Sequence, residues 1–198
     1  TNSFTVTDAS GNTATCSFTV TVNDTEAPTI TCNTPITVSN DAGVCGAMVT
    51  YSVTTSDNCA TTITQTAGLA SGSTFPIGTT TNSFIVTDPS GNTATCSFTV
   101  TVNDTQVPVI SGCPSNISVN NDLGVCGAMV TFTNPTASDN CSFTFTQTAG
   151  LPSGSIYPTG TTNNVFTATD ASGNITTCSF TVTVTDTEAP VITCPTPI

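Results

Sequence analysis

The chain has 198 residues, none of which is lysine, arginine or histidine, and it carries a formal net charge of −12. This composition excludes an imidazole general base, a Schiff-base lysine and a basic clamp for phosphate. Paired carboxylates, as in glycoside hydrolases, are still available, but they recur identically in every repeat and no pocket-forming insertion accompanies them, so we expect no enzymatic activity. The composition also excludes binding to nucleic acid or to an anionic membrane surface, since both need basic side chains.

An internal repeat runs through the whole chain. Thr1–Thr25 recurs at Thr81–Thr105 with two substitutions, and the cysteines at positions 32, 113 and 194 set a period of about 81 residues. Cutting the chain at the repeat junctions predicts four parts. These are the C-terminal part of a preceding module at 1–26, complete modules at 27–106 and 107–188, and the first strand of a following module at 189–198.

Strands are the only regular elements that the pattern predicts. Residues 47–53 and 93–102 alternate apolar and polar side chains, which is typical of half-buried antiparallel strands. Residues 82–87 form another strand, and the turn 88–92 joins it to 93–102 as a hairpin. About seven short strands per period, separated by turns, indicate an all-β fold of tandem immunoglobulin-like β-sandwich modules.

Ten cysteines recur at fixed spacings with no histidine beside them, so they predict disulfides rather than zinc sites. Stable disulfides need an oxidising compartment, which predicts an extracellular or cell-surface location for disulfide-stapled modules. No apolar run approaches the roughly 20 residues of a membrane-spanning helix, so we expect no membrane insertion.

Short motifs recur at the same places in each period: Thr25-Glu-Ala-Pro-Thr-Ile-Thr-Cys32, Ser56-Asp57-Asn58, Phe75-Pro76-x-Gly78, and Asp88-x-Ser-Gly-Asn92 followed by Cys96-x-Phe98-x-Val100-x-Val102. In combination they resemble the HYR (hyalin repeat) domain family, and the resemblance covers essentially the whole chain. It implies an immunoglobulin-like fold and a role in adhesion or extracellular scaffolding, with no enzymatic activity.

Each complete module has four cysteines, which allow three pairings that the sequence alone does not distinguish. Simpler members of the resembled family keep only the outer two cysteines, and a bond from the first strand to the last agrees with the topology. The resemblance therefore implies the bonds Cys32–Cys96, Cys45–Cys59, Cys113–Cys178 and Cys126–Cys141. Cys16 and Cys194 then have no partner within the chain.

All twelve acidic residues lie in turns or at junctions, and no basic side chain can form a salt bridge with them. If strands alternate in direction, the junction, the Asp57-Asn58 loop and the hairpin turn share one end of a module, and Asp41 lies at the other end beside the next junction. Clustered carboxylate and amide oxygens suit Ca²⁺. The candidate ligands are Asp24, Glu26, Asp41, Asp57, Asn58, Asp88, Asn92, Asp104, Asp139, Asn140, Asp170 and Asn174.

A second interpretation of these residues needs no ion. Asp and Asn favour turns because their side chains bond to nearby backbone groups, and surface carboxylates keep a Thr/Val-rich β protein soluble. Both interpretations stay open at the level of sequence. Separately, five sequons are candidate N-glycosylation sites, at Asn23, Asn103, Asn116, Asn140 and Asn174.

Two functions fit these observations. Near-identical modules joined by short, proline-containing junctions favour a structural filament or cell-surface stalk, whose partners are neighbouring modules or copies of the chain itself. Disulfides stiffen such an assembly, and Ca²⁺ at the junctions would add to this. The alternative is an adhesin or receptor ectodomain that binds a surface glycan or protein. The sequence favours the filament.

Overall fold

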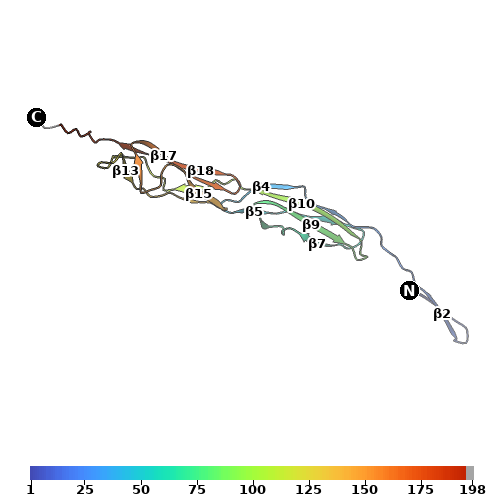
Figure 1. Ribbon diagram of the computed structural model, residues 1–198. Coiled ribbons are helices and arrows are strands. Elements are labelled where there is room, and N and C mark those ends of the chain that lie inside the picture. The colour runs from blue at the N-terminus through green and yellow to red at the C-terminus, as the bar shows by residue number, and fades with distance from the viewer. Residues whose placement is uncertain (195–198) are drawn as a thin grey trace. The chain divides into compact units, whose positions relative to one another are not determined.

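A computed structural model describes residues 1–194, and every regular element in this range is a β-strand (Figure 1). The all-β prediction is therefore confirmed. The chain divides into two compact units. Thr1–Ile36, Thr50–Ser71 and Thr80–Thr99 form the first, and Thr37–Val49, Gly72–Thr79 and the chain from Val100 onward form the second. Because this division cuts through the first repeat, the junction between the repeats lies inside the second unit. The described residues include no helix that could span a bilayer.

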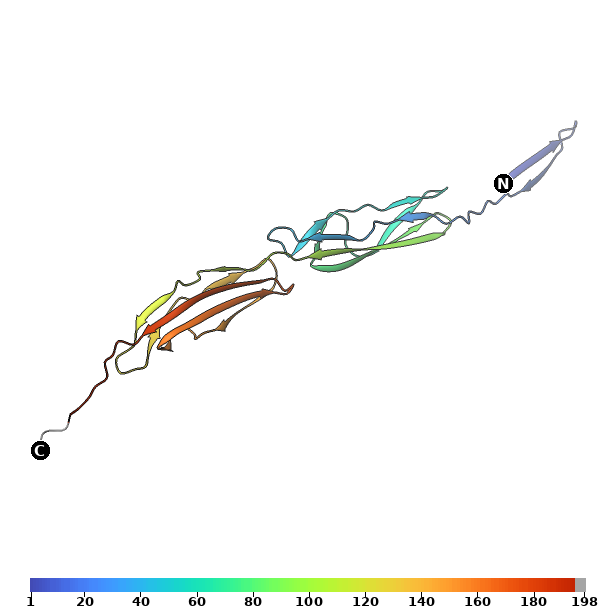
Figure 2. The ribbon, with the colours of Figure 1, turned by 90° about the horizontal axis from the view of Figure 1, so that it is seen from above.

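The second repeat is built around a four-stranded sheet in the order β12 (Ile117–Asn120), β18 (Ile175–Thr185), β17 (Gly160–Asp170) and β15 (Phe143–Ala149). β12 runs parallel to β18, and the other neighbours are antiparallel. The two long strands β17 and β18 lie side by side in both views (Figures 1 and 2). Two short antiparallel pairs complete the repeat, β11 (Val109–Ser111) with β14 (Thr136–Ser138) and β13 (Gly127–Val130) with β16 (Ser155–Pro158).

The first repeat has the same strand order. Its four-stranded sheet runs β4 (Ile36–Ser39), β10 (Thr93–Asn103), β9 (Gly78–Thr87) and β7 (Thr62–Ala67). The short pairs are β3 (Thr29–Thr31) with β6 (Thr54–Ser56) and β5 (Gly46–Val49) with β8 (Ser73–Pro76). The strands predicted at 82–87 and 93–102 fall within β9 and β10.

The strand predicted at 47–53 is shorter in the structure, where β5 ends at Val49. Beyond Val49, the Ser71 hydroxyl satisfies the backbone groups of Tyr51. Its Oγ accepts a hydrogen bond from Tyr51 N (2.8 Å) and donates one to Tyr51 O (2.7 Å). The Tyr51 ring still packs inward, 5.0 Å from the Phe98 ring centroid. The apolar alternation therefore continues for two residues beyond the end of the strand.

Alternation along β17 and β18 builds the core of the second repeat. Phe166 of β17 and Phe180 and Val182 of β18 are buried, whereas the threonines between them are partly exposed. Phe132 packs edge-on against Phe180 with the ring centroids 4.9 Å apart. Burial of each such side chain stabilises the fold by roughly 1.5–3 kcal/mol, so this hairpin is a firm support for the turn at its end.

A buried asparagine fixes the loop that follows β15. Asn164 Oδ1 accepts hydrogen bonds from Leu151 N (3.0 Å) and Gln147 Nε2 (3.2 Å). Gly150 has a φ of +86°, and a Cβ placed there would lie 2.1 Å from Asn164 Oδ1, so the position requires glycine. Asn82 and Gly68 repeat this arrangement in the first repeat.

Residues 1–26 contain one hairpin, in which β1 (Asn2–Thr7) pairs with β2 (Thr13–Phe18). Phe4 and Phe18 are 59% and 52% exposed, whereas their counterparts Phe84 and Phe98 are buried. At the other end, residues 189–194 contain no strand, although 189–198 is predicted to be one. The remaining residues of that prediction, 195–198, lie outside the described range.

Candidate metal centre and disulfide at the repeat junction

Two disulfides tie the first short strand of each repeat to its last long strand. Cys32 bonds to Cys96 with their Cα atoms 5.9 Å apart, and Cys113 bonds to Cys178 with the same separation. Cys96 lies in β10 and Cys178 in β18. These are the outer pairs that the family resemblance implies.

The inner pairs are different, and the expected bonds Cys45–Cys59 and Cys126–Cys141 are corrected. Cys45 of the first repeat bonds instead to Cys141 of the second, with the Cα atoms 4.9 Å apart, and both residues lie in the second compact unit. Cys59 and Cys126 are exposed free thiols, as are Cys16 and Cys194.

The register of the second repeat explains why Cys126 and Cys141 cannot meet. The Cys126 thiol lies 3.8 Å from the Thr159 hydroxyl, just before β17 begins, whereas Phe143, two residues after Cys141, pairs with Asp170 at the end of β17. An eleven-residue strand spans about 35 Å. The two cysteines therefore lie at opposite ends of the repeat. Strand alternation in the sequence already places Asp41 and Asp57 at opposite ends of a module. Cys45 and Cys59 are close to these residues in the sequence, so the same alternation indicated that they would not meet.

Three carboxylates gather at the junction, and we call Asp104, Asp139 and Asp170 the junction cluster. One carboxylate oxygen from each lies within 4.8 Å of the others, and Asp104 and Asp170 are only 8% and 5% exposed. Asp104 follows β10, Asp139 lies in the loop between β14 and β15, and Asp170 ends β17. The local strands thus bring together residues that are far apart in the sequence.

Backbone and amide groups hold the cluster in place. Asp170 Oδ1 accepts from Asn174 N (2.8 Å), and Asn174 Nδ2 donates both to Asp170 Oδ2 (2.8 Å) and to the Asp104 carbonyl (3.2 Å). Burial acts to raise the pKa of Asp170, but the hydrogen bonds from Asn174, Ser172 and Gly173 outweigh it and hold the pKa below its ordinary value. Asp170 is therefore ionised near neutral pH.

Two oxygens at this site are buried and have no hydrogen-bond donor among the described residues: Asp104 Oδ2 and Asn140 Oδ1. A buried carboxylate oxygen without a donor is costly, and the chain has no basic side chain to neutralise the three charges. Ca²⁺ binds carboxylate and amide oxygens of this kind at about 2.3–2.6 Å. The residues of the junction cluster, with Asn140, fit such an ion.

The counterpart cluster in the first repeat contains Asp24, Asp57 and the free thiol of Cys59. A hydrogen bond from the thiol to the Asp24 carboxylate raises the pKa of Cys59, and the same bond, with one from the Glu26 amide, lowers the pKa of Asp24. Asn92 Nδ2 donates to the Asp24 carbonyl (3.2 Å), as Asn174 does to Asp104. This cluster and the junction cluster thus share the hydrogen bond from a hairpin-turn asparagine to the backbone carbonyl of an aspartate.

The other candidate ligands lie around these clusters rather than in them. Asp88 Oδ2 accepts from Asn92 Nδ2 (2.7 Å), and Glu26 Oε2 accepts from Asn58 Nδ2 (3.2 Å). Asp41 belongs to neither cluster; its Oδ2 accepts from Met48 N (2.8 Å) and shapes the turn before β5. The turn-forming interpretation therefore describes Asp41, and the ion-binding interpretation fits the junction cluster.

Two sequons coincide with junction contacts. The Nδ2 atoms of Asn140 and Asn174, to which an N-glycan would be attached, donate to Val44 O (3.2 Å) and to Asp104 O. A glycan replaces one of the two hydrogens on Nδ2, and each of these atoms donates two hydrogen bonds, so glycosylation at either position would remove one of them and is disfavoured by the junction. Asn23, Asn103 and Asn116 stay as predicted sites.

Gln106 is a junction residue that the sequence did not single out. Its Oε1 accepts from Asn40 Nδ2 (2.9 Å) and from Gly43 N (2.8 Å), which holds the turn carrying Cys45. Glu26 and Glu188 occupy the same position in the repeat. Recurrence of a long polar side chain at this position was the available signal.

Comparison with known proteins gives consistent matches. The HYR domain model matches residues 23–102 and 103–184. Hyalin from Strongylocentrotus purpuratus is 40% identical over 203 residues, which cover 95% of this chain and 16% of that protein. Hyalin from Lytechinus variegatus is 37% identical, over 98% of this chain and 38% of that protein. The chain thus spans well under half the length of these relatives.

Weaker matches were also found. A sushi, von Willebrand factor type A, EGF and pentraxin domain-containing protein 1 from Rattus norvegicus is 34% identical over 56% of this chain and 3% of that protein. Among solved structures, the protocadherin gamma B4 extracellular domain aligns with a TM-score of 0.37 at 16% identity, over 92% of this chain and 37% of that chain. A structural likeness of this size supports no functional argument.

Proposed function

This chain belongs to the HYR domain family, and from that membership we propose that it is a structural component of an extracellular filament or cell-surface stalk. It is an extracellular, adhesion-related module. In the proposed assembly, HYR modules spanning 27–106 and 107–188 stack along the chain, and disulfides and Ca²⁺ stiffen their junctions.

The observation that carries the proposal is the bond between Cys45 and Cys141, which belong to successive repeats. A flexible linker would leave the repeats free to reorient, whereas a covalent bond beside the peptide connection gives a second point of attachment. The hydrogen bond from Asn140 Nδ2 to Val44 O lies next to it. A junction built in this way suits a protein that has to bear load along its length.

The junction cluster supports the Ca²⁺ part of the proposal. Asp104 comes from the connection between the repeats, and Asp139 and Asp170 come from two loops of the second repeat. Without a counterion these three charges repel one another at a largely buried site. An ion bound by all three holds the connecting segment against the second repeat.

An adhesin or receptor ectodomain that binds a glycan or a protein is the alternative. One observation favours it: Met129 and Ile156 are opposite each other in the β13–β16 pair and are 64% and 61% exposed. Cross-strand apolar pairs on an outer face are suited to contacts with a partner.

Calorimetric titration with CaCl₂ tests the Ca²⁺ site directly. We expect the intact chain to bind Ca²⁺, and the Asp104→Asn variant to lose one equivalent, because Asp104 supplies the buried oxygen that lacks a donor. Asp186→Asn is the matched control, since Asp186 Oδ1 accepts from Glu188 N as Asp104 Oδ1 accepts from Gln106 N, but Asp186 belongs to no such cluster among residues 1–194. Ca²⁺ at about 100 times its Kd adds about 2.7 kcal/mol of stability. The Ca²⁺ site is refuted if the intact chain and D104N bind the same amount.

A further inference from the structure

Cys126 occupies the same place in the second repeat that Cys45 occupies in the first. Both follow a Gly-Val pair in the turn between two short strands, and β13 begins at the residue after Cys126 as β5 does after Cys45. Cys45 is bonded to Cys141, whereas the thiol of Cys126 is free and exposed. The disulfide of Cys45 thus indicates which kind of bond the position of Cys126 allows.

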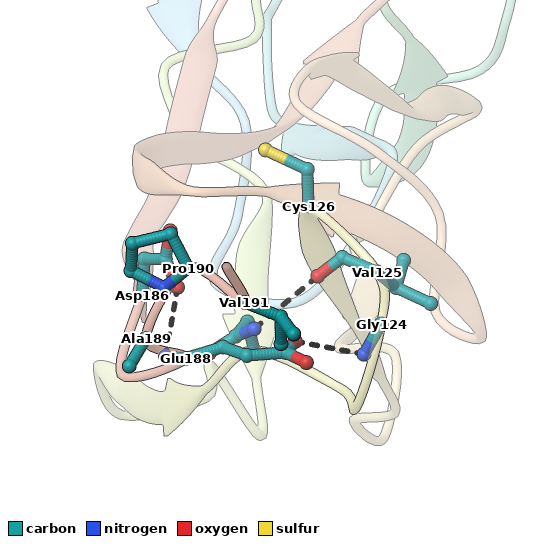
Figure 3. Close-up of a pocket in the computed structure, with 9 residues that line it drawn as sticks. Gly124, Val125, Cys126, Asp186, Glu188, Ala189, Pro190 and Val191 are labelled. Carbon is teal, nitrogen blue, oxygen red and sulfur yellow. Dashed lines mark hydrogen bonds between the residues drawn. The ribbon is translucent and has the colours of Figure 1, made fainter. Parts of the chain in front are cut away.

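The backbone around Cys126 already has the geometry of the bonded junction. Gly124 N donates to Glu188 Oε2 at 2.8 Å, as Gly43 N donates to Gln106 Oε1 at 2.8 Å (Figure 3). We call Asn121, Gly124, Val125, Cys126 and Glu188 the Cys126 socket. Its shape does not depend on an occupant, because its hydrogen bonds are internal to the second repeat.

Two further hydrogen bonds match between the socket and the bonded junction. Asn121 Nδ2 donates to Val125 O at 3.3 Å, and Asn40 Nδ2 donates to Val44 O at 3.3 Å. Thr187 N donates to Asn121 Oδ1 at 3.0 Å, and Thr105 N donates to Asn40 Oδ1 at 3.1 Å. At the bonded junction Val44 O accepts a second hydrogen bond, from Asn140 of the incoming loop. Val125 O is the corresponding acceptor.

An open cavity of about 500 Å³ lies beside the socket, lined by Val125, Cys126, Asp186 and Pro190 among others (Figure 3). At the bonded junction, the corresponding space holds the loop Asp139-Asn140-Cys141, and a smaller cavity of about 270 Å³ is left. Asp104 is buried there, whereas its counterpart Asp186 is exposed. Docking of such a loop would bury Asp186 in the same way.

The first repeat shows the loop in its free form. In Asp57-Asn58-Cys59, Cys59 N donates to Asp57 Oδ2 at 3.2 Å, as Cys141 N donates to Asp139 Oδ2 at 3.1 Å in the bonded loop. Cys59 is exposed. The loop therefore has the same turn whether or not its cysteine is bonded.

We propose that the Cys126 socket binds the Asp-Asn-Cys loop of the HYR module that follows along the same polypeptide, and that Cys126 forms a disulfide with that loop's cysteine. This inference rests on the proposed function, since it extends the stacking of modules to the next junction. Every repeat then carries a socket at one end and a loop at the other. The assembly becomes a chain of modules linked covalently twice at each junction.

The oxidant in this step is a low-molecular-weight disulfide such as oxidised glutathione. The thiolate of one cysteine attacks a sulfur of the oxidant and releases one glutathione thiol, which gives a mixed disulfide. The second cysteine attacks the protein sulfur of that mixed disulfide and releases the second glutathione thiol. Two protein thiols are oxidised to one disulfide, and one glutathione disulfide is reduced to two thiols.

The test is an extended chain in which a copy of residues 37–106 follows Ile198. Residues 187–198 match 25–36 except at two positions, so the copy continues the repeat in register. The protein is oxidised with the glutathione couple, alkylated without reduction and digested with pepsin for disulfide mapping. We expect a peptide in which Cys126 is bonded to Cys59 of the appended copy, and complete loss of Cys126 alkylation.

Controls separate this inference from the proposed function. In the extended chain with Cys59→Ser in the appended copy, Cys126 should again be alkylated completely. The Cys45–Cys141 peptide is the internal reference. If it is present and Cys126 is still alkylated in the extended chain, this inference is overturned while the proposed function stands. If Cys45–Cys141 is absent as well, the proposed function loses its support. If the bond to Cys126 instead joined Cys59 of another molecule in a covalent dimer, the proposal that the following module of the same polypeptide fills the socket would be wrong.

Discussion

At the scale of single residues, the two repeats exchange a tyrosine and a phenylalanine. The first has Tyr51 and Phe75, and the second has Phe132 and Tyr157 at the corresponding positions. The Tyr51 hydroxyl donates to the Leu69 carbonyl, and the Tyr157 hydroxyl donates to the Leu151 carbonyl, its counterpart. The hydroxyl thus reaches the same carbonyl from either position, and in both repeats a glutamine side chain, Gln65 or Gln147, is the second donor to it.

We predict that Tyr157→Phe destabilises the second repeat by about 1 kcal/mol, because the Leu151 carbonyl loses one of its two donors and keeps only Gln147 Nε2. The double variant Phe132→Tyr/Tyr157→Phe, which copies the first repeat, should recover most of this loss. Urea unfolding at neutral pH measures both variants. Equal losses in the single and the double variant would contradict the exchange.

The same tyrosine predicts a response to alkaline pH. Burial raises the pKa of Tyr157, and hydrogen bonds involving Asn164 and Leu151 oppose that shift only in part. Because the folded state favours the protonated hydroxyl, the contribution of Tyr157 to the free energy of unfolding is complete below the unfolded-state pKa of about 10. It is lost as the pH rises through the folded-state pKa. In Y157F this part of the alkaline loss should disappear, which urea unfolding on both sides of that pKa will show.

At the scale of elements, the short strand β11 depends on the disulfide beside it. β11 pairs with β14 over only three residues, and Cys113 follows it closely and is bonded to Cys178 within β18. So short a pairing contributes little by itself. The disulfide holds the edge of the repeat to the buried hairpin.

The Cys113→Ser/Cys178→Ser variant should therefore lose about 4 kcal/mol of stability, from the entropy of a loop whose ends are 65 residues apart. Urea unfolding under oxidising conditions measures the loss. Hydrogen exchange should show faster exchange of the β11 amides, with the amides of β17 and β18 as the reference. Unchanged protection of β11 would mean that its pairing with β14 suffices.

At the scale of the whole molecule, charge is entirely of one sign. Twelve acidic residues face no basic side chain, so every long-range charge interaction in the chain is repulsive except for that with the N-terminus. The turns that hold these residues keep them apart, but each junction brings several of them close together. Ions in the surrounding solution therefore belong to the energetics of this fold.

We predict that NaCl stabilises the chain even when a chelator is present. Raising its concentration from about 10 mM to about 150 mM shortens the Debye length from about 30 Å to about 8 Å. Urea midpoints should rise over this range at neutral pH and rise less near pH 4, where the carboxylates are partly protonated. A fall in stability at neutral pH would contradict the repulsion argument.

The sequence by itself determined what depends on local pattern. Alternation of apolar residues predicted the strands of the hairpin and the buried faces of Phe98, Val100 and Val102, because the side-chain period of a strand is independent of its neighbours. The turn residues Asp88 and Gly91 predicted the hairpin turn, which closes through a hydrogen bond from Gly91 N to Asp88 O. The resemblance to the HYR family supplied the outer disulfides.

Only the tertiary structure decided what happens where the repeats meet. Near-identical copies present the same cysteine twice, so spacing cannot tell whether Cys45 bonds within its own repeat or to Cys141, 96 residues away. The answer depends on which end of a repeat each turn occupies and on which ends face each other. The same holds for Asp104, because loops of the next repeat bury its Oδ2, which has no donor among the described residues. Local periodicity builds each module, but contacts between distant turns define the junction.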